Sequence, residues 1–174
     1  MGAVQDGHKK RGIFVRRSTL WRVPVYCIVA GIVCFYLNSW LFYRFTVYDT
    51  GNGIAVDTVR MLIEYGAFFV AAIVVGGFVF ARHMTRKELF WSASIAVLLF
   101  VVFEGIKWGM WIFDPKPSWY AQLWEFAWQS TQWSFFLEQL VFYCTGIAWL
   151  GSAAQAIAPY CLVFFGKKSI ENTE

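Results

Sequence analysis

Charged residues and histidine are scarce in this chain, and both shortages exclude classes of function. Only 15% of the 174 residues are charged, and the two histidines, His8 and His83, fall outside the long hydrophobic runs. A haem or histidine-ligated metal site inside those runs would need imidazole there. We therefore predict no metal and no cofactor.

Short catalytic motifs are absent as well. The sequence contains no G-x-S-x-G, no H-E-x-x-H, no phosphate-binding loop and no dinucleotide fingerprint. We therefore predict that the protein is not an enzyme. A carboxylate pair acting on a lipid head group is the catalytic alternative that the residues leave open.

Cysteine is present but lacks the spacing of a redox centre. All four cysteines lie within hydrophobic runs and none forms a C-x-x-C pair: Cys27, Cys34, Cys144 and Cys161. A disulfide-generating membrane oxidase needs a reactive pair, so that class is excluded. The cysteines are predicted to be small buried hydrophobic residues.

Apolar residues dominate what remains, at 59% of the chain. A helix that crosses the hydrocarbon layer needs about 20 mostly apolar residues. Four runs reach that length, so we predict an all-α, four-helix membrane bundle in a single domain. The spans are expected at about 23–43, 59–81, 89–113 and 133–157, the first being a retained helix rather than a signal peptide.

Basic residues predict the orientation of this bundle. Lysine and arginine concentrate before the first run, between the second and third, and after the fourth, which is typical of cytoplasmic segments. We expect a multi-pass protein of the cell membrane with both termini cytoplasmic: a basic segment at 1–22, the membrane domain at 23–166 and a tail at 167–174. The net charge of +4 follows from this topology and requires no nucleic-acid partner.

The last run is too long for one crossing. Residues 133–165 stay apolar throughout, and as a helix they would extend about 50 Å. We predict one span that ends near 157, with Pro159 redirecting the chain so that residues 160–165 lie along the inner surface. A single strongly tilted helix is the alternative.

Small residues at helical spacing predict close helix packing. Alanine and glycine recur every four residues in the second run, and a similar group follows Gly151 in the fourth. In lipid, small residues let helix backbones approach each other. The pattern favours packing inside the bundle, and an interface in a homo-oligomer or a larger membrane complex is the alternative.

The segment 118–131 is predicted to be an amphipathic helix on the outer membrane surface, between the third and fourth spans. Ser118, Gln122, Glu125 and Gln129 form one narrow polar stripe, and most other positions are aromatic or apolar. Aromatic rings of this kind favour the head-group layer. The interface residues are expected to be Trp119, Tyr120, Trp124 and Trp128, in an anchor or a lid.

Charges inside the runs identify a candidate site, because charged groups in lipid are costly and usually face partners. All of them fall in the outer half of the predicted bundle: Glu64, Glu104, Lys107 and Glu138, with Asn38 near the same depth. Pairing within a helix, Glu104 with Lys107 and Arg60 with Glu64, would make them structural.

The other interpretation of these charges is an acidic pocket, with Trp108 and Trp111 supplying aromatic faces. From it we expect a protein that binds or transports a small cationic or amphipathic ligand. A non-catalytic accessory or assembly subunit of a larger membrane complex is the alternative function.

Overall fold

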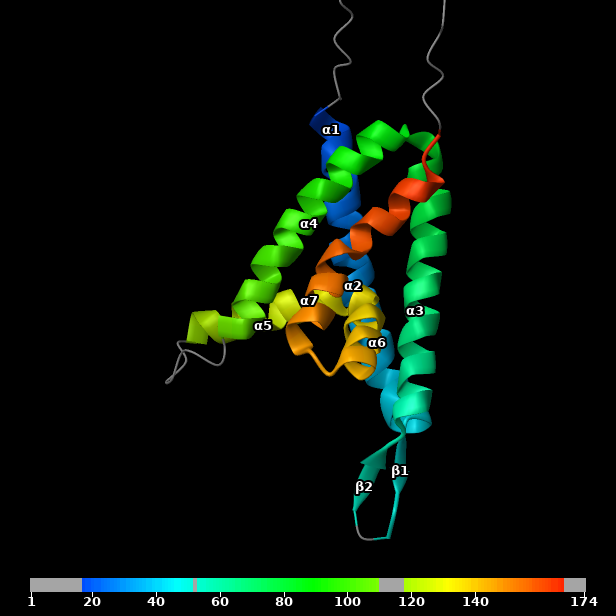
Figure 1. The fold of residues 1–174 in the computed structure, drawn as a ribbon, viewed down its shortest axis with the longest axis vertical. Helices are drawn as coiled ribbons and strands as arrows, with labels where there is room; N and C mark the ends of the chain where they lie inside the picture. The colour runs from blue at the N-terminus through cyan, green and yellow to red at the C-terminus, as the bar shows by residue number, and fades with distance from the viewer. Residues whose placement is uncertain (1–16, 52, 110–117, 168–174) are drawn as a thin grey trace, which may run out of the picture.

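The computed structural model describes residues 17–51, 53–109 and 118–167 of the chain, and these residues are mainly helical (Figure 1). The predicted all-helical class is therefore correct apart from one small hairpin. In chain order the elements are α1 (Arg17–Leu20), α2 (Arg22–Phe45), β1 (Val47–Asp49), β2 (Ile54–Val56), α3 (Thr58–Val79), η1 (Ala81–His83), α4 (Arg86–Gly109), α5 (Ser118–Thr131), η2 (Gln132–Ser134), α6 (Phe135–Thr145), α7 (Ala148–Ile157) and η3 (Ala158–Phe165).

Four helices are long and apolar enough to cross a membrane: Arg22–Phe42, Thr58–Val79, Arg86–Gly109 and the continuous helical segment Ala148–Phe165. The first three correspond to the first three predicted spans, although the expected extension of the third to 113 enters residues outside the described part. Both described ends of the chain lie at one end of the bundle, opposite the β-hairpin (Figure 1).

The fourth predicted span, 133–157, is wrong as a single helix. Gly146 ends α6 in a left-handed conformation with φ 71°, and the Thr145 hydroxyl oxygen accepts a hydrogen bond from the amide of Ile147. Glycine adopts this conformation without steric cost, so the chain reverses there. As a result α6 and α7 form a helical hairpin, and the apolar segment long enough to cross begins at Ala148.

The end of the chain also differs from the prediction. Pro159 stands near the start of η3 and does not redirect the chain onto a surface. Instead η3 continues from α7 and packs against α3 and α4, where Gly76 faces Leu162 and Gly77 faces Phe165. These glycines of α3 are therefore used for packing within the bundle.

The connection between α2 and α3 contains an antiparallel pair of short strands. Val47 pairs with Val56, and Asp49 pairs with Ile54 at the tip. The Asp57 side chain accepts hydrogen bonds from the amides of Val59 and Arg60, so it caps α3 directly after the hairpin.

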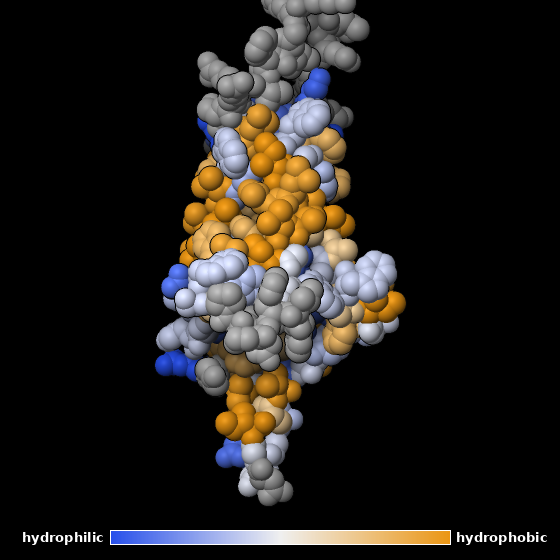
Figure 2. All heavy atoms as spheres, turned by 90° about the vertical axis from the view of Figure 1, so that its left-hand side faces the viewer, coloured by the Kyte–Doolittle hydropathy of each residue, from blue (hydrophilic) through white to orange (hydrophobic). Residues whose placement is uncertain are grey.

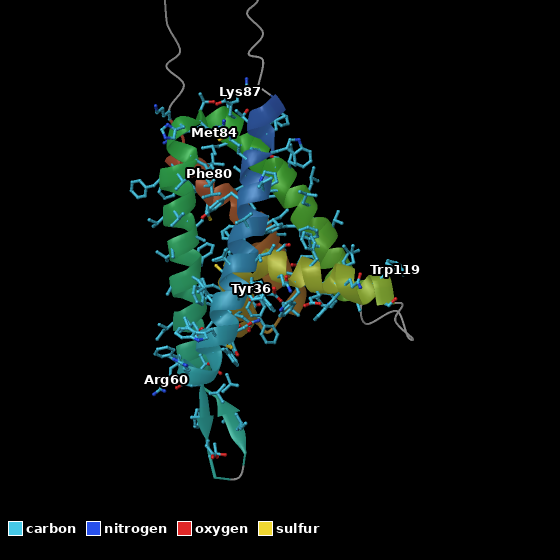
Figure 3. The ribbon with its side chains drawn as sticks, turned by 180° about the vertical axis from the view of Figure 1, so that it is seen from behind. Tyr36, Arg60, Phe80, Met84, Lys87 and Trp119 are labelled. Carbon is cyan, nitrogen blue, oxygen red and sulfur yellow. The ribbon has the colours of Figure 1, made fainter. Side chains whose placement is uncertain are left out.

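Helix α5 has the predicted bounds, but it does not lie free of the bundle along its whole length. Its N-terminal part extends away from α2 and α3, with Trp119 at the outer end (Figure 3), but it stays beside α4, where the Tyr120 hydroxyl donates a hydrogen bond to the Ile106 carbonyl. Its C-terminal part is buried against α2 and α4, where Ala127, Ser130 and Thr131 have almost no exposed surface. The end of α5 and the turn η2 therefore lie inside the bundle, and α6 begins directly after that turn.

The core forms around this entry point. Trp133 of η2 is fully buried, stacks on Phe69 of α3 at 5.8 Å between ring centroids, and contacts Phe100 of α4. Gly31 of α2 allows the close approach of α5, since a Cβ atom there would lie 2.1 Å from the carbonyl oxygen of Ser130.

Candidate functional site

A buried lysine organises the polar residues where α4, α5, α6 and α7 meet. The side chain of Lys107 is 8% exposed, and its Nζ lies 2.5 Å from Oε1 of Glu104 and 3.6 Å from Oε2 of Glu138. Nζ also donates a hydrogen bond of 2.9 Å to Oε1 of Gln155. We call Glu104, Lys107, Glu138, Gln155 and Thr131 the Lys107 cluster.

The members of the Lys107 cluster come from four helices, α4, α5, α6 and α7. Glu104 and Lys107 are three residues apart near the end of α4, so they share one helix face. Glu138 lies in the first turn of α6, and Gln155 lies near the end of α7. The reversal at Gly146 is what brings the last two together.

The end of α5 completes the cluster. The Thr131 hydroxyl lies 3.5 Å from Lys107 Nζ, and the Thr131 carbonyl accepts a 2.8 Å hydrogen bond from Nε2 of Gln155. The C-terminus of a helix carries a partial negative charge from its unpaired carbonyls. A buried ammonium beside it is therefore stabilised by the helix as well as by the carboxylates.

Acceptors outnumber donors in the Lys107 cluster. With both carboxylates ionised, Glu104 and Glu138 carry two negative charges against the single charge of Lys107. Three carboxylate oxygens are shielded from solvent and accept no hydrogen bond among the described residues: Oε1 of Glu104 and Oε2 of Glu138 face Lys107 as ion-pair partners, and Oε2 of Glu104 lacks even that contact. The cluster therefore retains acceptor capacity for a further cationic donor.

Aromatic side chains lie beside the cluster. Lys107 Nζ is 5.5 Å from the centroid of the Trp128 ring, which is within the range of a cation–π contact. Trp128 in turn stacks on Trp124 at 5.7 Å. Trp108, which follows Lys107 in the sequence, donates a 3.3 Å hydrogen bond from Nε1 to the hydroxyl of Ser152 in α7.

Asn38 and Glu64 are not among the contacts of the Lys107 cluster. Asn38 Nδ2 donates a 3.2 Å hydrogen bond to the hydroxyl of Tyr65, across the α2–α3 contact. The expected pairing of Arg60 with Glu64 is wrong, because Arg60 Nε lies 3.3 Å from Oδ2 of Asp57 instead. Asp57 is the N-cap residue of α3, three residues before Arg60, so its carboxylate lies within reach of the Arg60 guanidinium.

The remaining candidates divide by burial. Trp119 is 63% exposed, whereas Tyr120 is buried and its hydroxyl bonds to the carbonyl of Ile106. Trp124 and Trp128 are half-buried along the same helix. Trp111 lies outside the described residues.

Two residues of the cluster were missed by the sequence interpretation. Gln155 and Thr131 are polar residues in apolar surroundings, but only the hairpin at Gly146 brings Gln155 back to Lys107. A glycine after Thr145 in an apolar run was the available signal for that reversal. Within the described ranges, no group of three histidine, cysteine, aspartate or glutamate side chains could hold a metal ion.

Comparison with protein-family models, with curated proteins and with solved structures gives no match for this chain. Its function is therefore argued from the chemistry of the site.

Proposed function

We propose that the chain is a multi-pass membrane protein that binds a small organic cation, such as a primary amine, at the Lys107 cluster, as the binding step of transport. The observation that carries this proposal is the excess of buried carboxylate. Glu104 and Glu138 share one ammonium, and their remaining acceptor capacity suits a second one.

The surface supports membrane placement. Figure 2 shows a broad apolar surface between more hydrophilic parts of the molecule, and α4 contributes exposed Leu98, Val101 and Val102. Such a surface is stable when it faces lipid. Lys87 lies at the end of the bundle where the described chain ends lie, opposite Arg60 (Figure 3), and we propose that this end is cytoplasmic.

Ligand type follows from the groups present. The site already holds an alkylammonium, that of Lys107, with carboxylates, an amide oxygen and the Trp128 ring. A ligand amine can make the same contacts at Glu138, the more distant of the two carboxylates. When a ligand amine occupies Glu138, the Lys107 ammonium would give up its contact with Glu138 and keep those with Glu104 and Gln155.

Binding of alkylammonium ions to the purified chain in lipid nanodiscs tests this proposal. Trp128 supplies a fluorescence signal close to the site, and ethylammonium, butylammonium and tetraethylammonium are suitable probes. Glu138→Gln should weaken binding about tenfold or more, as expected for loss of a charged partner. The matched control is Glu125→Gln, since Glu125 is exposed and bonds only to Gln129 in the described contacts. Equal affinities in the parent chain and Glu138→Gln would disprove the site.

An accessory-subunit function has one specific observation in its favour. The β-hairpin presents Tyr48, Ile54 and Val56 outward, and Ile54 is 77% exposed. The hairpin projects beyond the helices, where a partner subunit could cover it (Figure 1). Purification from native membranes with another chain at fixed stoichiometry, lost on Ile54→Ser, would favour this function.

A further inference from the structure

The ammonium of Lys107 lies where a ligand amine would bind. An ammonium carries three N–H donors. Among the described contacts, four acceptor oxygens lie near Lys107 Nζ: Oε1 of Glu104 at 2.5 Å, Oε1 of Gln155 at 2.9 Å, Oγ1 of Thr131 at 3.5 Å and Oε2 of Glu138 at 3.6 Å. The lysine therefore occupies this set of acceptors when no ligand is present.

The contacts of Lys107 differ in length. The two short ones go to Glu104, three residues earlier on the same helix, and to Gln155. Gln155 is itself held in place, because its Nε2 donates a 2.8 Å hydrogen bond to the Thr131 carbonyl. Glu138 makes the longest contact, and Coulombic attraction falls with distance. Lys107 can therefore release Glu138 while it keeps both short contacts.

Solvent exposure identifies Glu138 as the carboxylate that an incoming cation reaches first. The Glu138 side chain is 21% exposed, compared with 10% for Glu104 and 8% for Lys107. A ligand amine at Glu138 meets the positive charge of Lys107 at close range, and like charges repel each other strongly in a partly buried site. The ligand and the lysine therefore compete for the same carboxylate.

We infer that Lys107 is a tethered competitor of the ligand: its ammonium occupies the amine site when no ligand is bound and withdraws from Glu138 when one binds. This inference rests on the proposed function and adds the regulation of that site. A tethered competitor pairs the carboxylates in the empty protein and lowers the affinity for every external amine. Removal of the lysine therefore strengthens amine binding, whereas removal of Glu138 weakens it. A lysine that only holds the carboxylates in place predicts weaker binding on removal.

Titration of butylammonium into the purified full chain in lipid nanodiscs, followed by tryptophan fluorescence, tests this inference. Lys107→Met should bind butylammonium about tenfold more tightly than the parent chain. That ratio corresponds to a lysine that leaves Glu138 free about one tenth of the time. The matched control is Lys87→Met, which removes an exposed lysine at the other end of α4 and should leave the affinity unchanged.

A double variant keeps the test decisive if Lys107→Met alone folds poorly. In Glu104→Gln the lysine has Glu138 as its one remaining carboxylate in the cluster, so amine binding should be weaker than in the parent chain. The double variant Glu104→Gln, Lys107→Met offers Glu138 without a competitor, so it should bind butylammonium more tightly than Glu104→Gln. A purely structural lysine gives the opposite order, because the double variant then loses a further support of the site.

The outcomes separate this inference from the proposed function. If the parent chain binds butylammonium and neither variant without Lys107 binds it more tightly than its counterpart with Lys107, the inference is overturned and the proposed function stands. If the variants without Lys107 bind butylammonium and the parent chain does not, Lys107 is a competitor that the amine cannot displace, and the proposed function alone is overturned. Absence of binding in all of these chains overturns both.

Discussion

Gly31 of α2 lies directly against the backbone of Ser130 in α5. A Cβ atom on Gly31 would approach the Ser130 carbonyl oxygen to 2.1 Å and the Gln129 carbonyl oxygen to 2.8 Å. Backbone atoms cannot move aside as a flexible side chain can. The position of α5 inside the bundle, and with it Thr131 of the Lys107 cluster, therefore depends on a residue without a side chain.

Gly31→Ala should destabilise the fold by about 1–3 kcal/mol, the usual cost of overpacking a well-packed contact. The matched control is Gly105→Ala on α4, where a Cβ atom meets nothing within 4 Å. Alanine in an open helical position is expected to be neutral or stabilising. Thermal unfolding in detergent compares the two, and equal melting temperatures would contradict the insertion of α5.

Lys107→Met should destabilise the bundle by about 3–5 kcal/mol, since it leaves Glu104 and Glu138 buried without their shared cation. Part of this loss should be recovered at low pH, where the carboxylates take up protons. The double variant Glu104→Gln, Lys107→Met should be more stable than Lys107→Met alone, as a double-mutant cycle would show. If Glu104→Gln changed the stability of the parent chain and of Lys107→Met by the same amount, the two side chains would not be coupled.

Substitution of either of two glycines in the α6–α7 hairpin should be destabilising, each for a different reason. Gly146→Ala should cost about 1 kcal/mol through backbone strain at φ 71°, although a Cβ atom there has open space. Gly151→Ala should cost more, because its Cβ atom would lie 2.6 Å from the Glu138 carbonyl oxygen. The clash would displace the Glu138 backbone and with it the Glu138 carboxylate. Amine binding should therefore weaken in Gly151→Ala and remain close to normal in Gly146→Ala.

Asp57 both caps α3 and pairs with Arg60, and two substitutions distinguish these contacts. Asp57→Asn keeps a capping oxygen and should change stability little, since the ion pair is exposed. Asp57→Ala removes the cap and should cost about 1 kcal/mol. If both variants unfolded at the same temperature, the cap would contribute nothing measurable.

The first three spans could be predicted because each is a separate apolar run with polar residues on both sides. The division of the last run could not be predicted from hydrophobicity, because 133–165 stays apolar through the turn. Gly146 marks that turn, but a glycine inside an apolar run is also common in an unbroken membrane helix.

The candidate site was predicted in part for a related reason. Glu104 and Lys107 share a helix face by their spacing, so their pairing follows from local geometry. Glu138 was correctly associated with them, whereas Asn38 and Glu64 were placed in the same site from depth alone. Depth along a helix does not specify azimuth, and the azimuth of α3 places Tyr65, not Glu64, toward Asn38 Nδ2.

The β-hairpin has a practical consequence for imaging this small protein. Its base is closed by a hydrogen bond from the amide of Asp57 to the carbonyl of Thr46, and its turn by one from Thr50 to Gly53. The strands project away from the helices (Figure 1), so a rigid domain inserted at the turn would stand clear of them. Such a fusion would act as a fiducial marker for particle alignment in electron cryomicroscopy, fixed to α2 and α3 by two short strands rather than by a flexible linker.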